Sequence, residues 1–301
     1  MTTHDVIIIG AGAAGLSAGL VLARAQLDVV LVDSGAPRNA PADSMHGFIS
    51  RDGMPPLDFL AAGRAEVSGY GTTLLSGFAT SIERRADLFT VSLDGSTLEA
   101  RAVLVATGLG DDLPALPGVA ERWGKSLQHC PYCHGFEVLG SKVVVAAGPN
   151  AAGTIHRAGL LRRYTPDLTV ITDGVELDAA DRATLDRLGV KVVDGSIVGF
   201  EGPGTALEQV RLADGTAIDA ETAFIAAPQR PHDQLLRGLG CDIHPTSGFV
   251  TVNEFGQTSV DGVWAAGNVV TPNALVITAA GAGAVAATVI SGWLLAKDLA
   301  Q

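Results

Sequence analysis

The clearest indication of the fold class is the segment Asp5-Val6-Ile7-Ile8-Ile9-Gly10-Ala11-Gly12-Ala13-Ala14-Gly15. Its four consecutive apolar residues, Val6 to Ile9, are typical of a strand that is buried on both faces of a parallel sheet. An Ala- and Leu-rich segment that reaches about Ala25 follows the glycines and predicts a helix. A second apolar run, Val29–Val32, then ends at Asp33. This order of elements predicts a β-α-β unit that binds a dinucleotide.

Each glycine of Gly10-x-Gly12-x-x-Gly15 has a separate task in such a unit. Gly10 permits the tight turn after the strand, Gly12 lets the backbone approach a pyrophosphate, and Gly15 lets the helix lie close to the strand. The free N–H groups at the start of the helix attract the pyrophosphate. The carboxylate of Asp33 can accept hydrogen bonds from a ribose diol and would repel a 2′-phosphate. The site is therefore predicted to take FAD or NAD rather than NADP.

A similar pattern occurs again in the middle of the chain. Val143–Val145 leads into Ala146-Ala147-Gly148-Pro149-Asn150-Ala151-Ala152-Gly153, then a helix to about Arg163 and a strand over Leu168–Ile171. Because doubly wound units pair parallel strands with helices, the sequence predicts an α/β protein. It is predicted to hold two Rossmann-like domains of the FAD/NAD(P)-binding type, the second inserted in the first.

Proline and glycine mark the predicted domain boundaries. Leu113-Pro114-Ala115-Leu116-Pro117-Gly118 is interpreted as a linker, and a second boundary is placed near His244-Pro245, before a strand over Val260–Ala266. We predict a discontinuous FAD-binding domain, residues 1–116 and 246–301. The inserted NAD(P)H-like domain, residues 117–245, carries the cysteine pair.

Composition argues against several classes of function. The 301 residues carry a net charge of −12 without a basic patch, so a nucleic-acid partner is not expected. The N-terminus lacks the positive segment of a signal peptide, and a cytoplasmic location is predicted. Val276–Ala296 is long and apolar enough to span a bilayer. Its Ala and Gly content and the glycine turn before it favour instead a helix buried on a sheet, with no membrane contact.

The chain has three cysteines, which are too few for the disulfide scaffold of a secreted protein. Two of them lie in the segment Cys130-Pro131-Tyr132-Cys133. The two-residue spacing allows one sulfur to attack when the other leaves, as in an exchangeable disulfide. His129 and His134 flank the pair, and a histidine can take the proton released when a dithiol is oxidised. Cys241 has no local partner and is predicted to be a core residue.

Other interpretations of the pair remain open at this stage. The two cysteines with His129 and His134 could be four zinc ligands. A histidine adjacent to each cysteine is, however, poorly spaced for closing one tetrahedron. The pair could also be purely structural. Redox chemistry is favoured over both, and no metal site is predicted.

The segment Cys130-Pro131-Tyr132-Cys133-His134-Gly135-Phe136-Glu137, between two dinucleotide folds, resembles dithiol oxidases of the thioredoxin reductase superfamily. Those enzymes close the disulfides of gliotoxin, holomycin and related natural products. Thr258–Asn268 resembles the second FAD motif of this group, and Ala106-Thr107-Gly108 and His46-Gly47-Phe48 are similar to its flavin-side loops. The resemblance covers essentially the whole chain. Thioredoxin reductases proper usually carry Asp where this chain has His134.

The resemblance implies that the cofactor is FAD, that Cys133 lies nearer the flavin and that the protein is a homodimer. Two positions depart from the family pattern: Asn268 stands in place of Asp, and Leu275 in place of Gln. The flavin site that the resemblance and the glycine motif imply consists of Gly10, Gly12, Ala13, Ala14, Gly15, Asp33, Ser34, Gly35, Arg38, Asn39, His46, Gly47, Ala79, Ala106, Thr107, Gly108, Gly267, Asn268, Leu275 and Val276.

The second dinucleotide site carries residues that oppose a nicotinamide cofactor. Ala147 and Pro149 occupy the places of the first two glycines. Ala147 adds a Cβ where a tight turn is needed, and Pro149 adds a ring and removes an N–H. Asp173 would repel a 2′-phosphate where thioredoxin reductases carry a His-Arg-Arg run, and Arg162-Arg163 is interpreted as a solvated helix end. The inserted domain is therefore predicted to keep its fold without binding NADPH.

Electrons must then enter from a dithiol. A substrate thiolate is predicted to attack Cys130, and the second thiol to close the product disulfide. Cys133 would pass the electron pair to FAD, and O2 would reoxidise it to give hydrogen peroxide, while His134 and His129 handle protons. The alternative is a disulfide reductase fed by NADH, ferredoxin or another donor. A third interpretation is a non-catalytic flavin-binding or redox-sensing protein.

Overall fold

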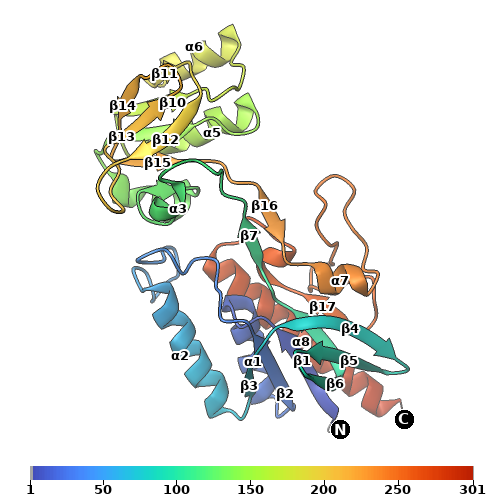
Figure 1. Ribbon diagram of the computed structural model, residues 1–301. Coiled ribbons are helices and arrows are strands. Elements are labelled where there is room, and N and C mark those ends of the chain that lie inside the picture. The colour runs from blue at the N-terminus through green and yellow to red at the C-terminus, as the bar shows by residue number, and fades with distance from the viewer. Residues whose placement is uncertain (1–2, 301) are drawn as a thin grey trace. The chain divides into compact units, whose positions relative to one another are not determined.

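The computed structural model describes residues 3–300, and its chain divides into two compact units (Figure 1). Unit 1 comprises the chain to Ala40, Gly47–Gly110 and the chain from Gln229. Unit 2 comprises Pro41–His46 and Asp111–Pro228. Positions 1, 2 and 301 of the predicted domain ranges lie outside the described residues.

Unit 1 is built on a seven-stranded sheet in the order β3-β2-β1-β6-β5-β4, with β17 also paired to β6. Strands β1, β2, β3, β6 and β17 are parallel, whereas β5 and β4 add an antiparallel extension. The sheet strands are β1 (Thr3–Ile9), β2 (Val29–Asp33), β3 (Thr73–Ser76), β4 (Ala79–Arg85), β5 (Leu88–Leu93), β6 (Ser96–Val105) and β17 (Val263–Ala265). The other elements of this part of the chain are α1 (Ala13–Arg24), α2 (Pro56–Gly69), β7 (Leu109–Asp111), β16 (Gln229–Pro231), α7 (Gln234–Gly238), η2 (Gly267–Val269) and α8 (Val276–Leu299).

Both faces of this sheet are buried, which explains the unbroken apolar run in β1. Val6 and Ile8 pack on one face with residues of α1 and α8, whereas Ile7 and Ile9 pack on the other with residues of β5 and α7. Alternate side chains of a strand point to opposite faces, so a strand covered on both sides must be apolar throughout. The four consecutive apolar residues Val6–Ile9 are therefore explained by the central position of β1 in the sheet.

Unit 2 repeats the architecture around a five-stranded parallel sheet in the order β11-β10-β9-β15-β8. A three-stranded antiparallel sheet, β12-β13-β14, packs with it in one core. Its elements are α3 (Val119–Arg122), β8 (Leu127–Gln128), α4 (Pro131–His134), η1 (Phe136–Val138), β9 (Val143–Ala146), α5 (Ala151–Leu161), β10 (Leu168–Ile171), α6 (Ala179–Arg187), β11 (Lys191–Val193), β12 (Ile197–Glu201), β13 (Gln209–Leu212), β14 (Ala217–Asp219) and β15 (Thr222–Phe224). The predicted fold class, two Rossmann-like folds with the second inserted in the first, is confirmed.

The boundaries between the units fall elsewhere than the prolines and glycines suggested. The chain crosses between the units at Gly110/Asp111 and Pro228/Gln229. Leu113 and Leu116, in the predicted linker, pack on the core of unit 2. Leu235 and Leu236 of α7, predicted to lie in the inserted domain, are buried in the core of unit 1. Apolar burial, rather than the position of turn residues, therefore decides where each unit ends.

Helix α8 is the one helix among residues 3–300 that is long and apolar enough to cross a membrane. Its buried face packs against α1, and the two helices approach closely at Gly283. A Cβ at Gly283 would lie 2.0 Å from the carbonyl oxygen of Ala14. This packing is that of a core helix in a soluble-type fold.

Candidate active site

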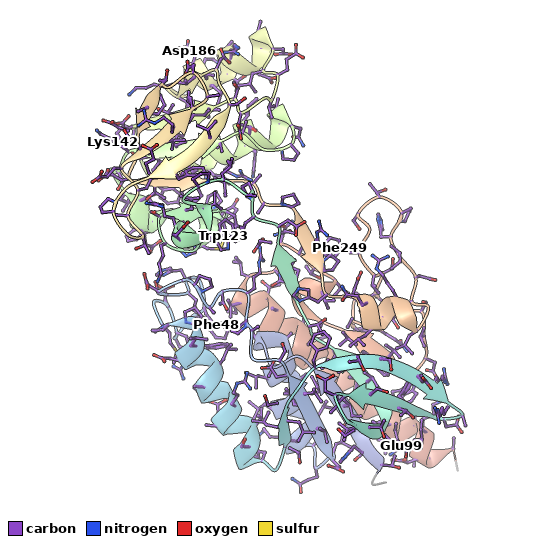
Figure 2. All side chains as sticks on the ribbon, in the orientation of Figure 1. Phe48, Glu99, Trp123, Lys142, Asp186 and Phe249 are labelled. Atoms are coloured by element: carbon purple, nitrogen blue, oxygen red, sulfur yellow. A yellow bond between two sulfur atoms is a disulfide. The ribbon has the colours of Figure 1, made fainter. Side chains whose placement is uncertain are left out.

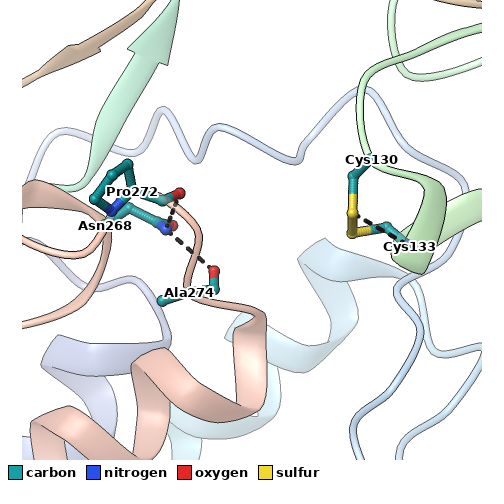
Figure 3. The surroundings of a disulfide bond; sticks show 5 residues. All are labelled: Cys130, Cys133, Asn268, Pro272 and Ala274. Carbon is teal, nitrogen blue, oxygen red and sulfur yellow. Dashed lines mark hydrogen bonds between the residues drawn. A yellow bond between two sulfur atoms is a disulfide. The ribbon is translucent and has the colours of Figure 1, made fainter. Parts of the chain in front are cut away.

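The cysteine pair forms a disulfide on a short helix in unit 2 (Figure 3). Cys130 is the N-cap of α4, and Pro131 occupies the first turn, where its missing N–H costs nothing. The backbone N–H of Cys133 donates a hydrogen bond to Sγ of Cys130 at 3.1 Å. Because this donor favours a negative sulfur, Cys130 is the better leaving thiolate once the disulfide is opened.

Gly135 holds the cysteine helix against the rest of unit 2. A Cβ at this position would lie 2.4 Å from both the carbonyl oxygen of Pro131 and Cε2 of Tyr164. Only glycine fits between the helix and that ring. Tyr132 and Phe136 are 64% and 71% exposed, so the segment that carries the disulfide presents two exposed aromatic side chains.

His134 is the predicted proton acceptor, and the structure gives it two ionisable neighbours. His46 meets its ring edge-on with centroids 6.4 Å apart, and Glu137 lies on the same short segment. Burial lowers the pKa of His134, the carboxylate of Glu137 opposes that decrease, and His46 adds to it. A base with a lowered pKa is neutral at physiological pH and free to accept a proton.

His129, the second predicted proton carrier, stacks on Trp123 in unit 2, with ring centroids 5.6 Å apart (Figure 2 labels Trp123). His46 was predicted to lie on the flavin side. The structure places it in unit 2 beside His134, and its contact with the flavin stays a prediction. The sequence could not reveal this, because His46 and His134 come together only when Pro41–His46 folds onto unit 2.

The predicted dinucleotide loop in unit 1 has the required glycine geometry. Gly10 has a φ of +104°, and a Cβ there would lie 2.4 Å from the carbonyl oxygen of Ala106. A Cβ at Gly15 would lie 1.8 Å from the carbonyl oxygen of Gly10. Helix α1 begins after Gly12, and no side chain of residues 3–300 caps it, so its first N–H groups are available to an anion.

Asp33 organises this loop through both carboxylate oxygens. Oδ1 accepts a hydrogen bond from the N–H of Ala11 at 2.8 Å, and Oδ2 accepts one from Gly35 at 3.1 Å. Arg64 of α2 forms an ion pair with the same carboxylate. No sequence pattern pointed to Arg64, because it lies on a helix far along the chain. A carboxylate has about four acceptor positions, so one stays available for a ribose hydroxyl.

The flavin-side loop after β6 is fixed by a residue that the sequence did not single out. Thr107 donates its hydroxyl hydrogen to the carbonyl oxygen of His232 at 2.6 Å, and the N–H of His232 donates to Gly108 at 3.0 Å. The predicted flavin-site residues other than His46 all belong to unit 1, and those not yet placed are Ala13, Ser34, Arg38, Asn39, Gly47, Ala79, Gly267, Leu275 and Val276.

Asn268 supports the loop before α8 through its amide nitrogen (Figure 3). Nδ2 lies 3.1, 3.0 and 3.1 Å from the carbonyl oxygens of Thr271, Pro272 and Ala274. An Asp, the usual residue here, could not donate to these oxygens. Leu275 is the N-cap of α8 and provides no side-chain cap within the described chain, so the departure from Gln leaves the helix N-terminus open.

Two N–H groups of the second dinucleotide loop, in unit 2, are occupied by the loop's own side chains. Asn150 caps α5, accepting a hydrogen bond from the N–H of Gly153 at 2.8 Å. Thr154 accepts one from Gly148 at 2.9 Å. These N–H groups are the ones that a pyrophosphate would use. Ala147 stands where Gly10 stands in unit 1, since the N–H of each donates to the end of the neighbouring strand.

The place for a 2′-phosphate is also occupied by protein contacts. Oδ1 of Asp173 accepts a hydrogen bond from the N–H of Ile197 at 2.8 Å, which fixes an acid at the end of β10. Arg162 donates to the carbonyl oxygens of Leu188 and Thr165, so it is a structural residue and not part of a solvated helix end. Arg163, the other half of that prediction, is exposed.

The arrangement of the cysteines bears on two further predictions: that the chain has no metal site, and that Cys241 is a core residue. Among residues 3–300, no group of three or more His, Cys, Asp or Glu side chains is arranged to hold a metal ion. Both candidate cysteine ligands are bonded to each other. Cys241 is buried, as predicted, at 5% exposure, and burial raises the pKa of its thiol.

An open phosphate-binding helix, an acid that can hold a ribose and a redox disulfide together define a flavin-dependent oxidoreductase that acts on thiols and disulfides. The residues of unit 1 fit FAD, because Gly10 and Gly15 form a cradle that a Cβ would fill. The pyridine nucleotide-disulphide oxidoreductase family matches residues 4–284, and the chain belongs to this family, whose thioredoxin reductase-like members bind FAD.

Several relatives are similar over nearly the whole chain. Thioredoxin reductase tcpT of Claviceps purpurea is 32% identical, with 88% of this chain and 86% of that protein covered. Thioredoxin reductase sirT of Leptosphaeria maculans is 30% identical, with 98% and 96% covered. The crystal structure of HlmI matches with a TM-score of 0.95 and 46% identity, covering 99% of this chain and 94% of that one. The thioredoxin reductase-like resemblance drawn from the cysteine motif is confirmed.

Proposed function

We propose that this protein is an FAD-dependent dithiol oxidase that closes a disulfide in a small dithiol, with O2 as the final acceptor. The observation that carries the proposal is the contrast between the two dinucleotide loops. Helix α1 begins without a side-chain cap in the described chain, whereas Asn150 caps α5 and Thr154 accepts a hydrogen bond from the N–H of Gly148 in the loop before it. A flavoprotein of this kind that does not accept hydride from NADPH can draw its electrons from a substrate dithiol instead.

The chain's own residues account for the first half of the reaction. His134 accepts a proton from one substrate thiol, and the resulting thiolate attacks Sγ of Cys130. Cys133 leaves as a thiolate. The second substrate sulfur then displaces Cys130, which the N–H of Cys133 stabilises as it departs. When bound, FAD supplies a two-electron acceptor for the reduced cysteine pair and a site of reoxidation by O2, which gives hydrogen peroxide.

The decisive experiment is anaerobic flavin reduction with three donors: dithiothreitol, NADPH and NADH. We expect dithiothreitol to bleach the flavin rapidly and both nicotinamides to do so at least about a hundredfold more slowly. Readmission of O2 should restore the yellow colour with hydrogen peroxide formed. Rapid bleaching by NADPH would contradict the proposal, and rapid bleaching by NADH would favour a disulfide reductase.

Cysteine variants test the assigned roles. In Cys133→Ser, dithiothreitol should no longer reduce the flavin, whereas Cys130 should still form a mixed disulfide with a thiol reagent. Cys241→Ser is the matched control, because its thiol is buried in the core of unit 1 and should not affect turnover. A flavin that stays oxidised while the wild-type cysteine pair is reduced would point to a redox sensor.

A further inference from the structure

Three polar side chains gather around His46 within unit 2. Oε1 of Glu137 lies 3.3 Å from Nε2 of His46, and Oγ of Ser44 lies 3.0 Å from the same nitrogen. The ring of His46 faces that of His134 edge-on at 6.4 Å. The histidine that follows Cys133 therefore has both a carboxylate and a second imidazole near it.

His46 is brought to this place by a segment that is anchored independently of its own side chain. Asp43 forms an ion pair with Lys125. Gly124, with a φ of +75°, lies so close to Pro41 that a Cβ would come within 2.9 Å of the proline ring. Because the backbone of Pro41–His46 packs on unit 2 at these points, the position of His46 is a fixed property of the fold.

The charges around His134 act in opposite directions. Nδ1 of His134 is buried and has no hydrogen-bond partner among the described residues. Glu137 favours the protonated ring, and a protonated His46 would oppose it. Helix α5 contacts α4, and its ionisable side chains are those of His156 and Arg157.

We propose that Glu137, held in place by His46, stabilises the imidazolium that forms at His134 when a substrate thiol is deprotonated. This inference rests on the dithiol oxidation proposed above, and it makes Glu137 and His46 positioning residues of that reaction. The proton passes from the thiol to His134, a bond forms between the substrate sulfur and Cys130, and the Cys130–Cys133 bond breaks. The second substrate thiol gives its proton to the Cys133 thiolate, and its sulfur attacks the first substrate sulfur, so that the substrate disulfide forms as the bond to Cys130 breaks. The substrate thus loses two electrons and the cysteine pair gains them, and Cys130 departs as a thiolate.

The test is the pH profile of disulfide reduction in the FAD-loaded protein under anaerobic conditions. Dithiothreitol is the electron donor, and reduced cysteines are counted by rapid alkylation and mass spectrometry. Neutral His134 is the active form, so the rate rises with pH as the ring loses its proton. Glu137→Gln should move this rise to lower pH and slow the reaction roughly threefold to tenfold at neutral pH, because the ring becomes a weaker base.

His46→Gln should move the rise in the opposite direction, to higher pH. Glutamine can still donate a hydrogen bond to Glu137, but it removes a like charge from the vicinity of His134. Histidine resonances in NMR titrations of the same proteins provide a readout that does not depend on turnover: the pKa of His134 should fall in Glu137→Gln and rise in His46→Gln. Glu176→Gln, an exposed carboxyl between β10 and α6, is the matched control.

The outcomes separate this inference from the proposed function. If the wild type reacts with dithiothreitol but Glu137→Gln gives the same profile as Glu176→Gln, the role of Glu137 is overturned. If the pKa of His134 moved in the same direction in Glu137→Gln and His46→Gln, the conclusion that Glu137 and His46 act on it in opposite directions would be overturned. A wild-type disulfide that dithiothreitol does not reduce would instead contradict dithiol oxidation itself.

Discussion

At the scale of single residues, Gly135 and His134 do the most to shape the cysteine site. No larger residue fits at position 135, because a Cβ there would collide with the carbonyl oxygen of Pro131 and the ring of Tyr164. We expect Gly135→Ala to lower the free energy of unfolding by about 1–3 kcal/mol and to slow disulfide reduction. Gly159→Ala, in the interior of α5 where a Cβ would meet only a methyl group at 3.8 Å, should be neutral or stabilising by about 0.5–1 kcal/mol. Urea unfolding of both variants measures the difference, and equal losses would contradict it.

The lowered pKa of His134 makes stability depend on pH. Burial lowers it from the usual 6.5, so the unfolded chain binds this proton at a higher pH than the folded chain does. The associated stability is fully present above pH 6.5 and is lost as the pH falls through the lowered folded value. We expect His134→Gln to lose less free energy of unfolding than the wild type between about pH 7.5 and about pH 5. His156→Gln, an exposed site on α5, should follow the wild type, and a wild-type pH dependence in His134→Gln would count against the burial argument.

At the scale of elements, the loop into α8 depends on a donor that aspartate lacks. Asn268→Asp would place a carboxylate against three carbonyl oxygens, all within 3.1 Å of the present amide nitrogen. We expect the variant to retain FAD about tenfold less tightly, since loss of such hydrogen bonds costs on the order of 1–2 kcal/mol. Asn253→Asp is the matched control, because the Oδ1 of Asn253 accepts hydrogen bonds from Phe255 and Gln257 and aspartate can do the same. Flavin release under dilution, followed by fluorescence, distinguishes the two; equal retention would show that the amide is dispensable.

At the scale of the whole molecule, the two units have separate cores. Unit 1 is built on one pair of apolar clusters and unit 2 on another, each pair covering the two faces of its own sheet. A ligand stabilises only the structure that it binds. Removal of FAD should therefore speed amide hydrogen exchange in α1 and α8 and leave exchange in β9 and β10 within about twofold. Mass spectrometry of the FAD-loaded and FAD-free proteins makes the comparison, and a uniform increase across both units would contradict it.

Both dinucleotide folds and the redox pair could be predicted from the amino-acid sequence, because they depend on local features. A doubly buried strand must be apolar at consecutive positions, Gly10 must tolerate a φ of +104°, and Cys130 and Cys133 are brought together by their spacing alone. Ala147 and Pro149 likewise revealed the altered second loop. Three features became visible only in the folded chain: the boundaries of the two units, the placement of His46 beside His134 and Glu137, and the support that Arg64 and His232 give to the loops of unit 1. Those contacts join residues far apart in the chain, and packing of the two cores, rather than any local pattern, fixes which distant side chains meet.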